Sequence, residues 1–173
     1  DYDMDARTAT IRKQQEVPNF DPAKYASERI WIAARDGKRV PVSVLSLKGA
    51  PRDGTSPMLL QGYGSYGANY PIAFNSNRMS LVDRGMMVAF AHIRGGGELG
   101  KPWHDDGRML RKMNTFTDFI DAAEALIAQG YTSRDRLTIS GRSAGGLLMG
   151  AVTNLRPDLF KAVVAGVPFV DVI

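Results

Sequence analysis

The chain has 173 residues, of which 44% are hydrophobic and 23% charged, a mixture ordinary for a globular domain with a buried core. It contains no cysteine, which excludes disulfide bonds, thiolate metal sites and a cysteine nucleophile. The formal net charge is +4, but acidic residues are interleaved with the basic ones and no basic patch accompanies an aromatic stacking motif. We therefore expect no nucleic-acid partner.

The two ends of the sequence bear on location and completeness. The first residues are polar and lack the apolar core of a signal peptide, and no apolar stretch is long enough to span a membrane. We expect no membrane partner and a cytoplasmic location, with the periplasm as the alternative. Because the chain begins at Asp1 instead of a Met and ends on an apolar run, we expect both ends to be cuts in a longer polypeptide.

Alternating runs of apolar residues and turn residues predict the order of the elements. After a short β-like patch within residues 1–15 and a loop at 18–22, the pattern predicts a hairpin with strands at 27–34 and 40–47 and a turn at Asp36-Gly37. Further strands are predicted at 58–60, 86–93, 136–140 and 162–167, the last of them buried, and helices at 78–84, 115–129 and 147–154.

The helix predicted at 115–129 has the clearest signals. Its apolar residues recur at helical spacing, Thr115 and Asp118 resemble a capping box, and Gly130 is placed as a C-terminal stop.

From residue 58 onward, strands and helices alternate, and the strands lack a clean polar alternation. This order predicts a mostly parallel sheet covered on both faces, an α/β architecture. With the leading hairpin, it is the layout of the N-terminal half of an α/β-hydrolase fold.

Residues 141–145 read GRSAG and match the G-x-S-x-G pattern of a nucleophile turn. In such a turn Ser143 projects from the sheet edge, and side chains at Gly141 and Gly145 would collide. The alternative is a glycine turn without chemistry. The preceding strand and the following helix of small and apolar residues favour Ser143 as the nucleophile.

A serine nucleophile needs a histidine base, oriented by a carboxylate, and in this fold the chain order is Ser, Asp or Glu, then His. Asp158 and Asp171 follow Ser143, but no histidine does. His92 lies in an apolar strand and is predicted to be a hydrogen-bonded core residue, while His104 is assigned no role. The triad is therefore incomplete in this sequence, and the chain alone is expected to be inactive. Neither a metal nor a cofactor is expected.

Acyl transfer also needs donors for the developing oxyanion. One is expected to be the backbone N–H of Ala144, at the positive end of the following helix. The second should come from the loop 62–67 (GYGSYG), where Tyr63 could donate its hydroxyl or could simply pack with Tyr66 over a glycine turn.

The other glycine-rich loop, 94–98 (RGGGE), lacks phosphate-loop spacing. We expect it to form a tight turn in which Arg94 and Glu98 pair.

Four segments, at 62–67, 94–119, 141–160 and 167–172, occur in the order and form found in the prolyl oligopeptidase family of serine peptidases. The sequence resembles this family over nearly its whole length, and its oligopeptidase B branch most of all. The resemblance implies that residues 1–26 are the end of a β-propeller and its connector, and that residues 27–173 are the N-terminal part of an α/β-hydrolase catalytic domain.

The same resemblance implies roles for single residues. Ser143 matches the nucleophile, Tyr63 and Ala144 match the oxyanion donors, and Tyr66 matches an aromatic residue that lines the substrate pocket. The implied substrates are short peptides cut after Arg or Lys, recognised by acidic residues expected beyond Ile173. The oligomeric state is not indicated. The alternatives are a related esterase or acyl-peptide hydrolase, or a catalytically dead domain used for interaction.

Overall fold

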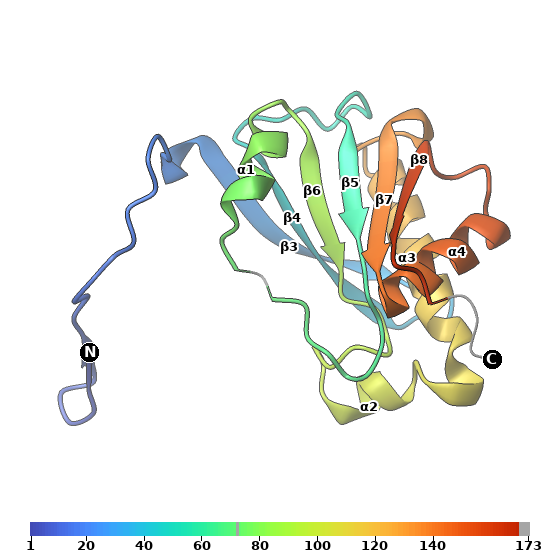
Figure 1. Cartoon of the computed structure of the whole chain (residues 1–173), viewed down its shortest axis with the longest axis horizontal. Coiled ribbons are helices and arrows are strands. Elements are labelled where there is room, and N and C mark those ends of the chain that lie inside the picture. Colours follow the sequence, from blue (N-terminus) through green and yellow to red (C-terminus); the bar gives the residue numbers. More distant parts are fainter. Residues whose placement is uncertain (72, 170–173) are drawn as a thin grey trace.

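The structure, a computed structural model, describes residues 1–71 and 73–169. In this part of the chain, six strands form one sheet in the order β3-β4-β6-β5-β7-β8, and two more form a separate ribbon (Figure 1). The strands are β1 (Tyr2–Asp3), β2 (Thr8–Ala9), β3 (Tyr25–Ala33), β4 (Arg39–Leu47), β5 (Met58–Gln61), β6 (Met87–Ala91), β7 (Leu137–Arg142) and β8 (Ala162–Gly166). The helices are α1 (Ser76–Val82), α2 (Lys101–Asp105), α3 (Met113–Ala128) and α4 (Ala144–Leu155), with short 3-10 helices at Pro22–Lys24, Met109–Arg111 and Arg134–Arg136.

The sheet is mixed. β6, β5, β7 and β8 run parallel to one another, and the β3–β4 hairpin joins the sheet through an antiparallel β4–β6 pair. The hairpin turns at Gly37, whose φ of +81° is a backbone conformation that glycine adopts without steric cost. Parallel central strands linked by helices confirm the predicted α/β class.

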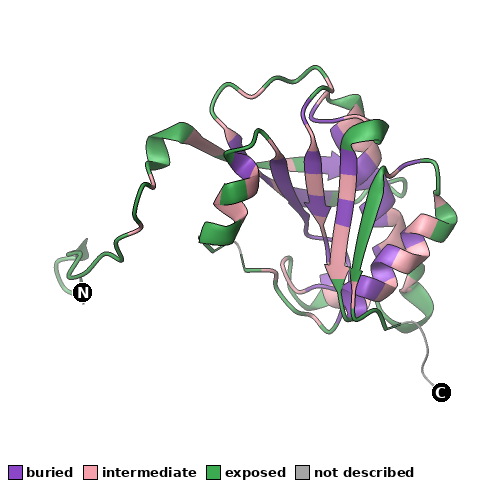
Figure 2. Cartoon of the chain, turned by 45° about the horizontal axis from the view of Figure 1, so that its top comes forward, coloured by how far each residue is buried: buried purple, intermediate pink, exposed green. Residues whose placement is uncertain are grey.

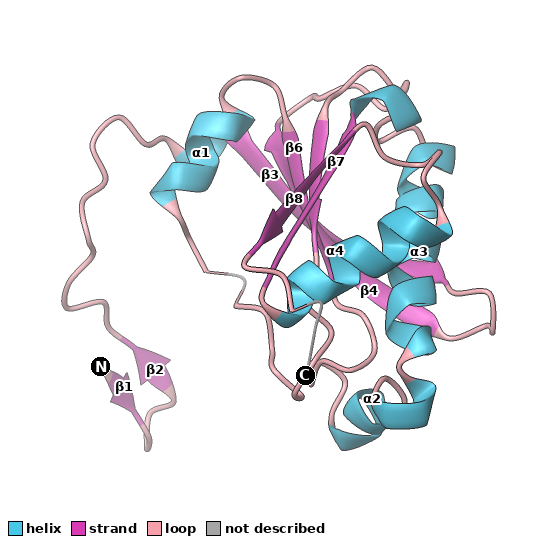
Figure 3. Cartoon of the chain, turned by 45° about the vertical axis from the view of Figure 1, so that its right-hand side comes forward, coloured by secondary structure: helices cyan, strands magenta, loops and turns pink. Residues whose placement is uncertain are grey.

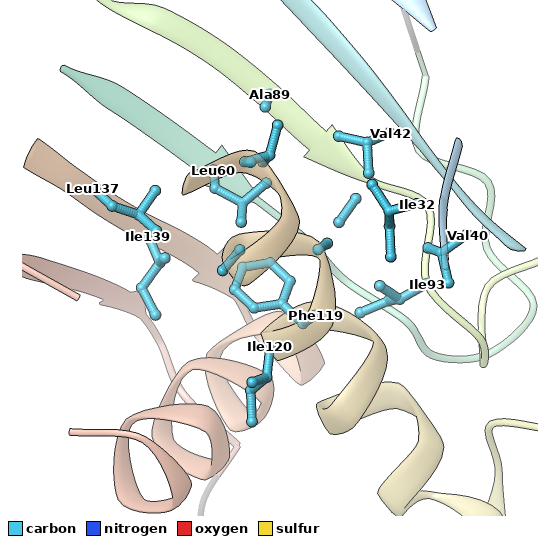
Figure 4. Packing of buried hydrophobic residues seen from close by; sticks show 14 of the residues in the cluster. Ile32, Val40, Val42, Leu60, Ala89, Ile93, Phe119, Ile120, Leu137 and Ile139 are labelled. Atoms are coloured by element: carbon cyan, nitrogen blue, oxygen red, sulfur yellow. The ribbon is translucent and has the colours of Figure 1, made fainter. Parts of the chain in front are cut away.

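Helices cover both faces of the sheet (Figure 3). On one face, α3 and α4 pack over the main core, where the fully buried ring of Phe119 lies among aliphatic side chains such as Leu60 and Ile139 (Figure 4). On the other face, α1 packs Val82 near Val88 and Phe90. Burying these side chains contributes about 1.5–3 kcal/mol each, which fixes the sheet that carries the loops at its carboxyl edge.

The predicted capping box of α3 is wrong. The helix begins at Met113, and the Thr115 hydroxyl donates to the carbonyls of Arg94 and Gly107 at 2.8 and 3.0 Å. Asp118 accepts hydrogen bonds from Arg94 instead of completing a box. Both side chains are fully buried, so partners across the core outweigh a local cap. Gly130, with a φ of +75°, does follow the end of α3 as predicted.

β8 is not the buried strand that its apolar sequence predicts. It pairs with β7 on one side and is exposed along its length, with Val164 at 56% exposure (Figure 2). In the described residues α4 contacts β8 from one side, but no further strand pairs with its outer edge, and its valines are largely exposed.

The first 24 residues extend away from the sheet as an exposed arm carrying the β1–β2 ribbon (Figure 1). β3 begins at Tyr25, so the sheet takes in the last residues assigned to the connector. The division into a propeller end and a catalytic domain stays a prediction. Among the described residues, no helix combines the length and the apolarity needed to cross a bilayer.

Candidate active site

Ser143 lies at the turn between β7 and α4, where it is the N-cap of the helix. Its φ of +58° and ψ of −118° are a strained combination for a residue with a side chain, the kind that persists where surrounding contacts enforce it. Here backbone hydrogen bonds enforce it: the Ser143 N–H donates to the Gly166 carbonyl at 2.9 Å, and the Ser143 carbonyl accepts from Gly146 at 2.8 Å. The side chain is left exposed at the sheet edge.

The two glycines of the turn are required by close backbone approach. A Cβ on Gly141 would lie 2.2 Å from the carbonyl oxygen of Gly145, and a Cβ on Gly145 would lie 2.8 Å from that of Gly62. The second contact brings the start of α4 against the loop that follows β5. The absence of a side chain at Gly145 thus also sets how closely the Ser143 turn and the loop after β5 approach.

A cleft of about 200 Å³ opens at Ser143, between the carboxyl ends of β5 and β7. Tyr63 lines this cleft together with Ser143, and Tyr70 closes it from a neighbouring loop. The ring of Tyr63 is half-buried, and its centroid lies 6.4 Å from that of Tyr66. Tyr63 and Ser143, which are 80 residues apart in sequence, therefore face one cavity.

Ala144 and Tyr66 line a second, adjacent pocket of about 560 Å³. Ala144 is the first residue of α4, so its N–H has no acceptor within the helix and lies at the positive end of the helix dipole. Tyr66 is 73% exposed and has a φ of +60°. Leu147 and Phe169 complete the apolar part of this pocket.

Neither histidine is placed to act as a base for Ser143. His92 is buried, with Nε2 2.9 Å from Ser43 Oγ and Nδ1 3.3 Å from a Glu98 oxygen, which confirms the prediction of a hydrogen-bonded core residue. His104 Nδ1 lies 2.9 Å from the Gly95 carbonyl. Neither side chain lines the Ser143 cleft in the described structure.

The acidic residues downstream of Ser143 do not supply the triad either. Asp158 lies on the surface, paired with Arg134 and Arg156, and Asp171 lies outside the described residues.

The predicted Arg94–Glu98 pair is wrong. Arg94 binds Asp118 through two side-chain contacts of 2.9 and 2.6 Å and also binds Asp36 at 2.6 Å. These hydrogen bonds, those to Asp118 first, raise the pKa of Arg94 above its usual range. Glu98 has other partners: its carboxylate accepts a hydrogen bond from the Tyr70 N–H at 2.9 Å and contacts the His92 ring. The buried Arg94 and the partly buried Glu98, at opposite ends of a short loop, are thus each paired with residues outside that loop.

Lys112 also contacts the site, although no sequence pattern predicts it. Its Nζ donates to the Gly64 carbonyl at 2.6 Å and to the Ser65 hydroxyl at 2.8 Å. Burial lowers its pKa to about 8. In the sequence it stands among other basic residues, and no local pattern separates it from them. Among the described residues, no group of three or more acidic or histidine side chains is placed to hold a metal ion.

Comparison with known proteins gives concordant results at three levels. Residues 72–173 match a family model described as the prolyl oligopeptidase family. The chain is 50% identical over 175 residues to dipeptidyl aminopeptidase BI of Pseudoxanthomonas mexicana, covering 99% of this chain and 24% of that protein. It is 46% identical over 154 residues to protease 2 of Moraxella lacunata, covering 89% and 22%.

Among solved structures, oligopeptidase B from Leishmania major superposes with a TM-score of 0.91 at 48% identity, over 96% of this chain and 23% of that one. This likeness and the mostly parallel sheet confirm the α/β-hydrolase fold. The chain spans about a quarter of the length of the curated relatives it matches.

Proposed function

The chain belongs to the prolyl oligopeptidase family, and from this premise we propose that it carries the nucleophile and the oxyanion donors of a serine peptidase. The observation that supports this most directly is the strained Ser143 turn, which shares one cleft with Tyr63. A bare glycine turn would not need a non-glycine residue at a φ of +58°.

In the proposed reaction, Ser143 Oγ attacks the carbonyl carbon of a peptide bond. A histidine from outside the described residues takes the hydroxyl proton, and the carbonyl oxygen gains negative charge. The C–N bond then breaks, the amine leaves with that proton, and water hydrolyses the resulting ester on Ser143.

The two donors proposed for the oxyanion come from different elements. The Ala144 N–H is free of intrahelical bonding, and the Tyr63 hydroxyl belongs to the loop that packs on Gly145. Donors fixed before the reaction stabilise the transition state without reorganisation, which accounts for a large share of catalysis in acyl transfer.

For the substrate, we propose short peptides cut after Arg or Lys. The likeness to a structure named oligopeptidase B supports this, together with the form of the 62–67 loop. Tyr66 and Phe169 would line the pocket for the residue before the cut, and recognition of a guanidinium requires carboxylates from outside the described residues.

A second candidate is release of dipeptides from free N-termini, favoured by the 50% identity to a protein named dipeptidyl aminopeptidase BI. Paired substrates with free and blocked N-termini separate the two candidates. A strict requirement for a free amine would replace the first candidate with the second.

The central test uses the complete polypeptide in which this sequence occurs. We expect a serine-reactive fluorophosphonate to label Ser143, located by peptide mass spectrometry, and Ser143→Ala to abolish both labelling and amide hydrolysis. Ser80→Ala, an exposed serine on α1, is the control and should change neither. Hydrolysis that survives in Ser143→Ala would refute the assignment, and a folded protein that never labels would favour the interaction-domain alternative.

A further inference from the structure

Lys112 reaches from the start of α3 into the loop that carries both active-site tyrosines. It is the residue before Met113, the first residue of the helix. Its two hydrogen bonds, 2.6 Å to the Gly64 carbonyl and 2.8 Å to the Ser65 hydroxyl, fall on the two residues between Tyr63 and the exposed Tyr66. The Lys112 ammonium group therefore holds the middle of this loop through two hydrogen bonds.

The loop needs such a tie because its own side chains hold it weakly. Gly64 and Tyr66 both have positive φ values, +65° and +60°. The Tyr66 ring is mostly in solvent, so its packing does not enforce the conformation. Backbone hydrogen bonds support the two ends of the loop: the Gly62 N–H donates to the Ser140 carbonyl at 3.4 Å, the Gly67 N–H donates to the Gly95 carbonyl at 2.9 Å, and the Ser65 carbonyl accepts from Ala68 at 3.1 Å. Among the described residues, the Gly64 carbonyl and the Ser65 hydroxyl are held by Lys112.

The charge of Lys112 has no structural explanation as an ion pair. No carboxylate of the described residues pairs with it, and the other ionisable groups that line its pocket are Tyr66 and the basic side chains His104 and Arg108. The Phe116 ring, 5.8 Å from Nζ, offers only a weak cation–π contact. Burying an unpaired ammonium costs stability, and a methionine of similar length would pack there at lower cost.

We propose that Lys112 is a positioning residue for the oxyanion hole, fixing Gly64 and Ser65 so that the Tyr63 hydroxyl meets the developing charge. This inference rests on the proposed function of Tyr63. An ammonium suits the task because its three donors can hold a carbonyl and a hydroxyl together, which an apolar side chain cannot do. Charge-assisted hydrogen bonds are also stronger than neutral ones.

The test is a double-mutant cycle in the complete polypeptide, with Lys112→Met, Tyr63→Phe and the combination. We expect Lys112→Met to lower kcat about ten- to a hundredfold with little change in KM, because the contact it supports forms only in the transition state. The loss should not exceed that of Tyr63→Phe. In the Tyr63→Phe background, Lys112→Met should change kcat by less than about twofold, since residues that act through one another are not additive.

Two further variants separate positioning from a general loss of structure. Ser65→Ala removes one of the two acceptors and should give a smaller loss with the same non-additivity; it keeps the test decisive if Lys112→Met does not fold. Lys101→Met, at an exposed lysine on α2 paired with Asp105, is the matched control and should leave kcat unchanged.

Two results would overturn the inference: an unchanged kcat in Lys112→Met, or an equal loss in both backgrounds. If Tyr63→Phe itself left kcat unchanged while Ser143→Ala was inactive, the Tyr63 assignment would fail and this inference with it. The serine peptidase proposal would stand in that case.

Discussion

Two glycine-rich loops leave the carboxyl ends of neighbouring parallel strands, yet they differ in the exposure and the charge pairing of their side chains. The loop 62–67 after β5 opens onto the Ser143 cleft and places the Tyr66 ring in solvent. The loop 94–98 after β6 is largely closed, with the Arg94 side chain 3% exposed and bound to two carboxylates. Glycine content alone therefore does not show which loop contributes residues to the candidate active site.

The second loop is best understood as support for the first. A Cβ on Gly95 would lie 2.2 Å from the Gly64 carbonyl oxygen, and a Cβ on Gly97 would lie 2.3 Å from that of Gly67. Glycine in the loop 94–98 thus allows the loop 62–67 to lie directly on it. The loop 94–98 is ion-paired to the core through Arg94, and the loop 62–67 lies against it.

The largest expected effect is loss of the ion pair that anchors the second loop. Asp118→Ala leaves the buried Arg94 guanidinium without its main partner, and we expect the free energy of unfolding to fall by about 3–5 kcal/mol in urea denaturation. Asp158→Ala, which breaks two surface ion pairs, should cost far less. Similar losses in the two variants would show that the Arg94 pair is not the anchor.

The next effect concerns the exposed loop and acts on catalysis. Tyr63→Phe removes one proposed oxyanion donor, so we expect kcat to fall about 10²–10³-fold, which corresponds to about 2.7–4 kcal/mol of activation free energy. The ring is retained, and the unfolding midpoint should hardly move. A large drop in stability with kcat preserved would instead assign Tyr63 to packing over the glycine turn.

A third prediction tests the contact between the two loops with a matched pair of glycines. Gly95 and Gly85 both have a positive φ, +95° and +84°, but a Cβ on Gly85 meets nothing within 4 Å. Gly85→Ala should cost about 1 kcal/mol or slightly more from backbone strain. Gly95→Ala should cost about 1–3 kcal/mol beyond that and lower kcat, because the Gly64 backbone must move. Equal costs would mean that the loops separate freely.

A smaller effect is the response of the second loop to acid. Burial raises the pKa of Glu98, but hydrogen bonds from His92 and the Tyr70 N–H outweigh it, and the net pKa is lowered. The stability that Glu98 contributes is therefore present above its unfolded pKa and is lost as pH falls through the lower, folded value. Unfolding measured across acidic pH should show this loss, and Glu98→Gln should flatten that part of the curve.

The last effect is the response of the first loop to alkali, and it has the same sign: stability rises with pH. Lys112 has a pKa of about 8 in the folded state against 10.5 unfolded, so the full cost of burying its charge applies below pH 8. That cost is relieved as pH rises from about 8 to 10.5, and Lys112 contributes rising stability over this range. Lys112→Met should remove the rise; a variant that still shows it would place the titration on another group.

Sequence predicts well what local pattern determines. The apolar runs at 58–60 and 136–140 mark the central strands, and GRSAG marks a turn whose glycines are sterically required. Sequence pattern fails to predict a side-chain contact when the two residues are distant in the chain. Arg94 joins Asp118, 24 residues away, and not the nearby Glu98, because a core position offers two carboxylate oxygens at bonding distance.

The same limit hides Lys112, since its acceptors lie 47 and 48 residues upstream. The apolar composition of β8 predicts a buried strand, but a strand is buried only where other elements pack against it. In the described residues its outer edge has no neighbour.

The backbone of Ser143 is held by residues that are synthesised well after it. Its N–H bonds to Gly166, and its carbonyl also accepts from the Phe169 N–H at 3.3 Å. A nascent chain released only as far as α4 would contain Ser143 and its hydrogen bond from Gly146, but not the bonds to Gly166 and from Phe169. The full set of hydrogen bonds around Ser143 can therefore form only after residues 166–169 have been synthesised, so the geometry of this turn is completed late in the synthesis of the segment.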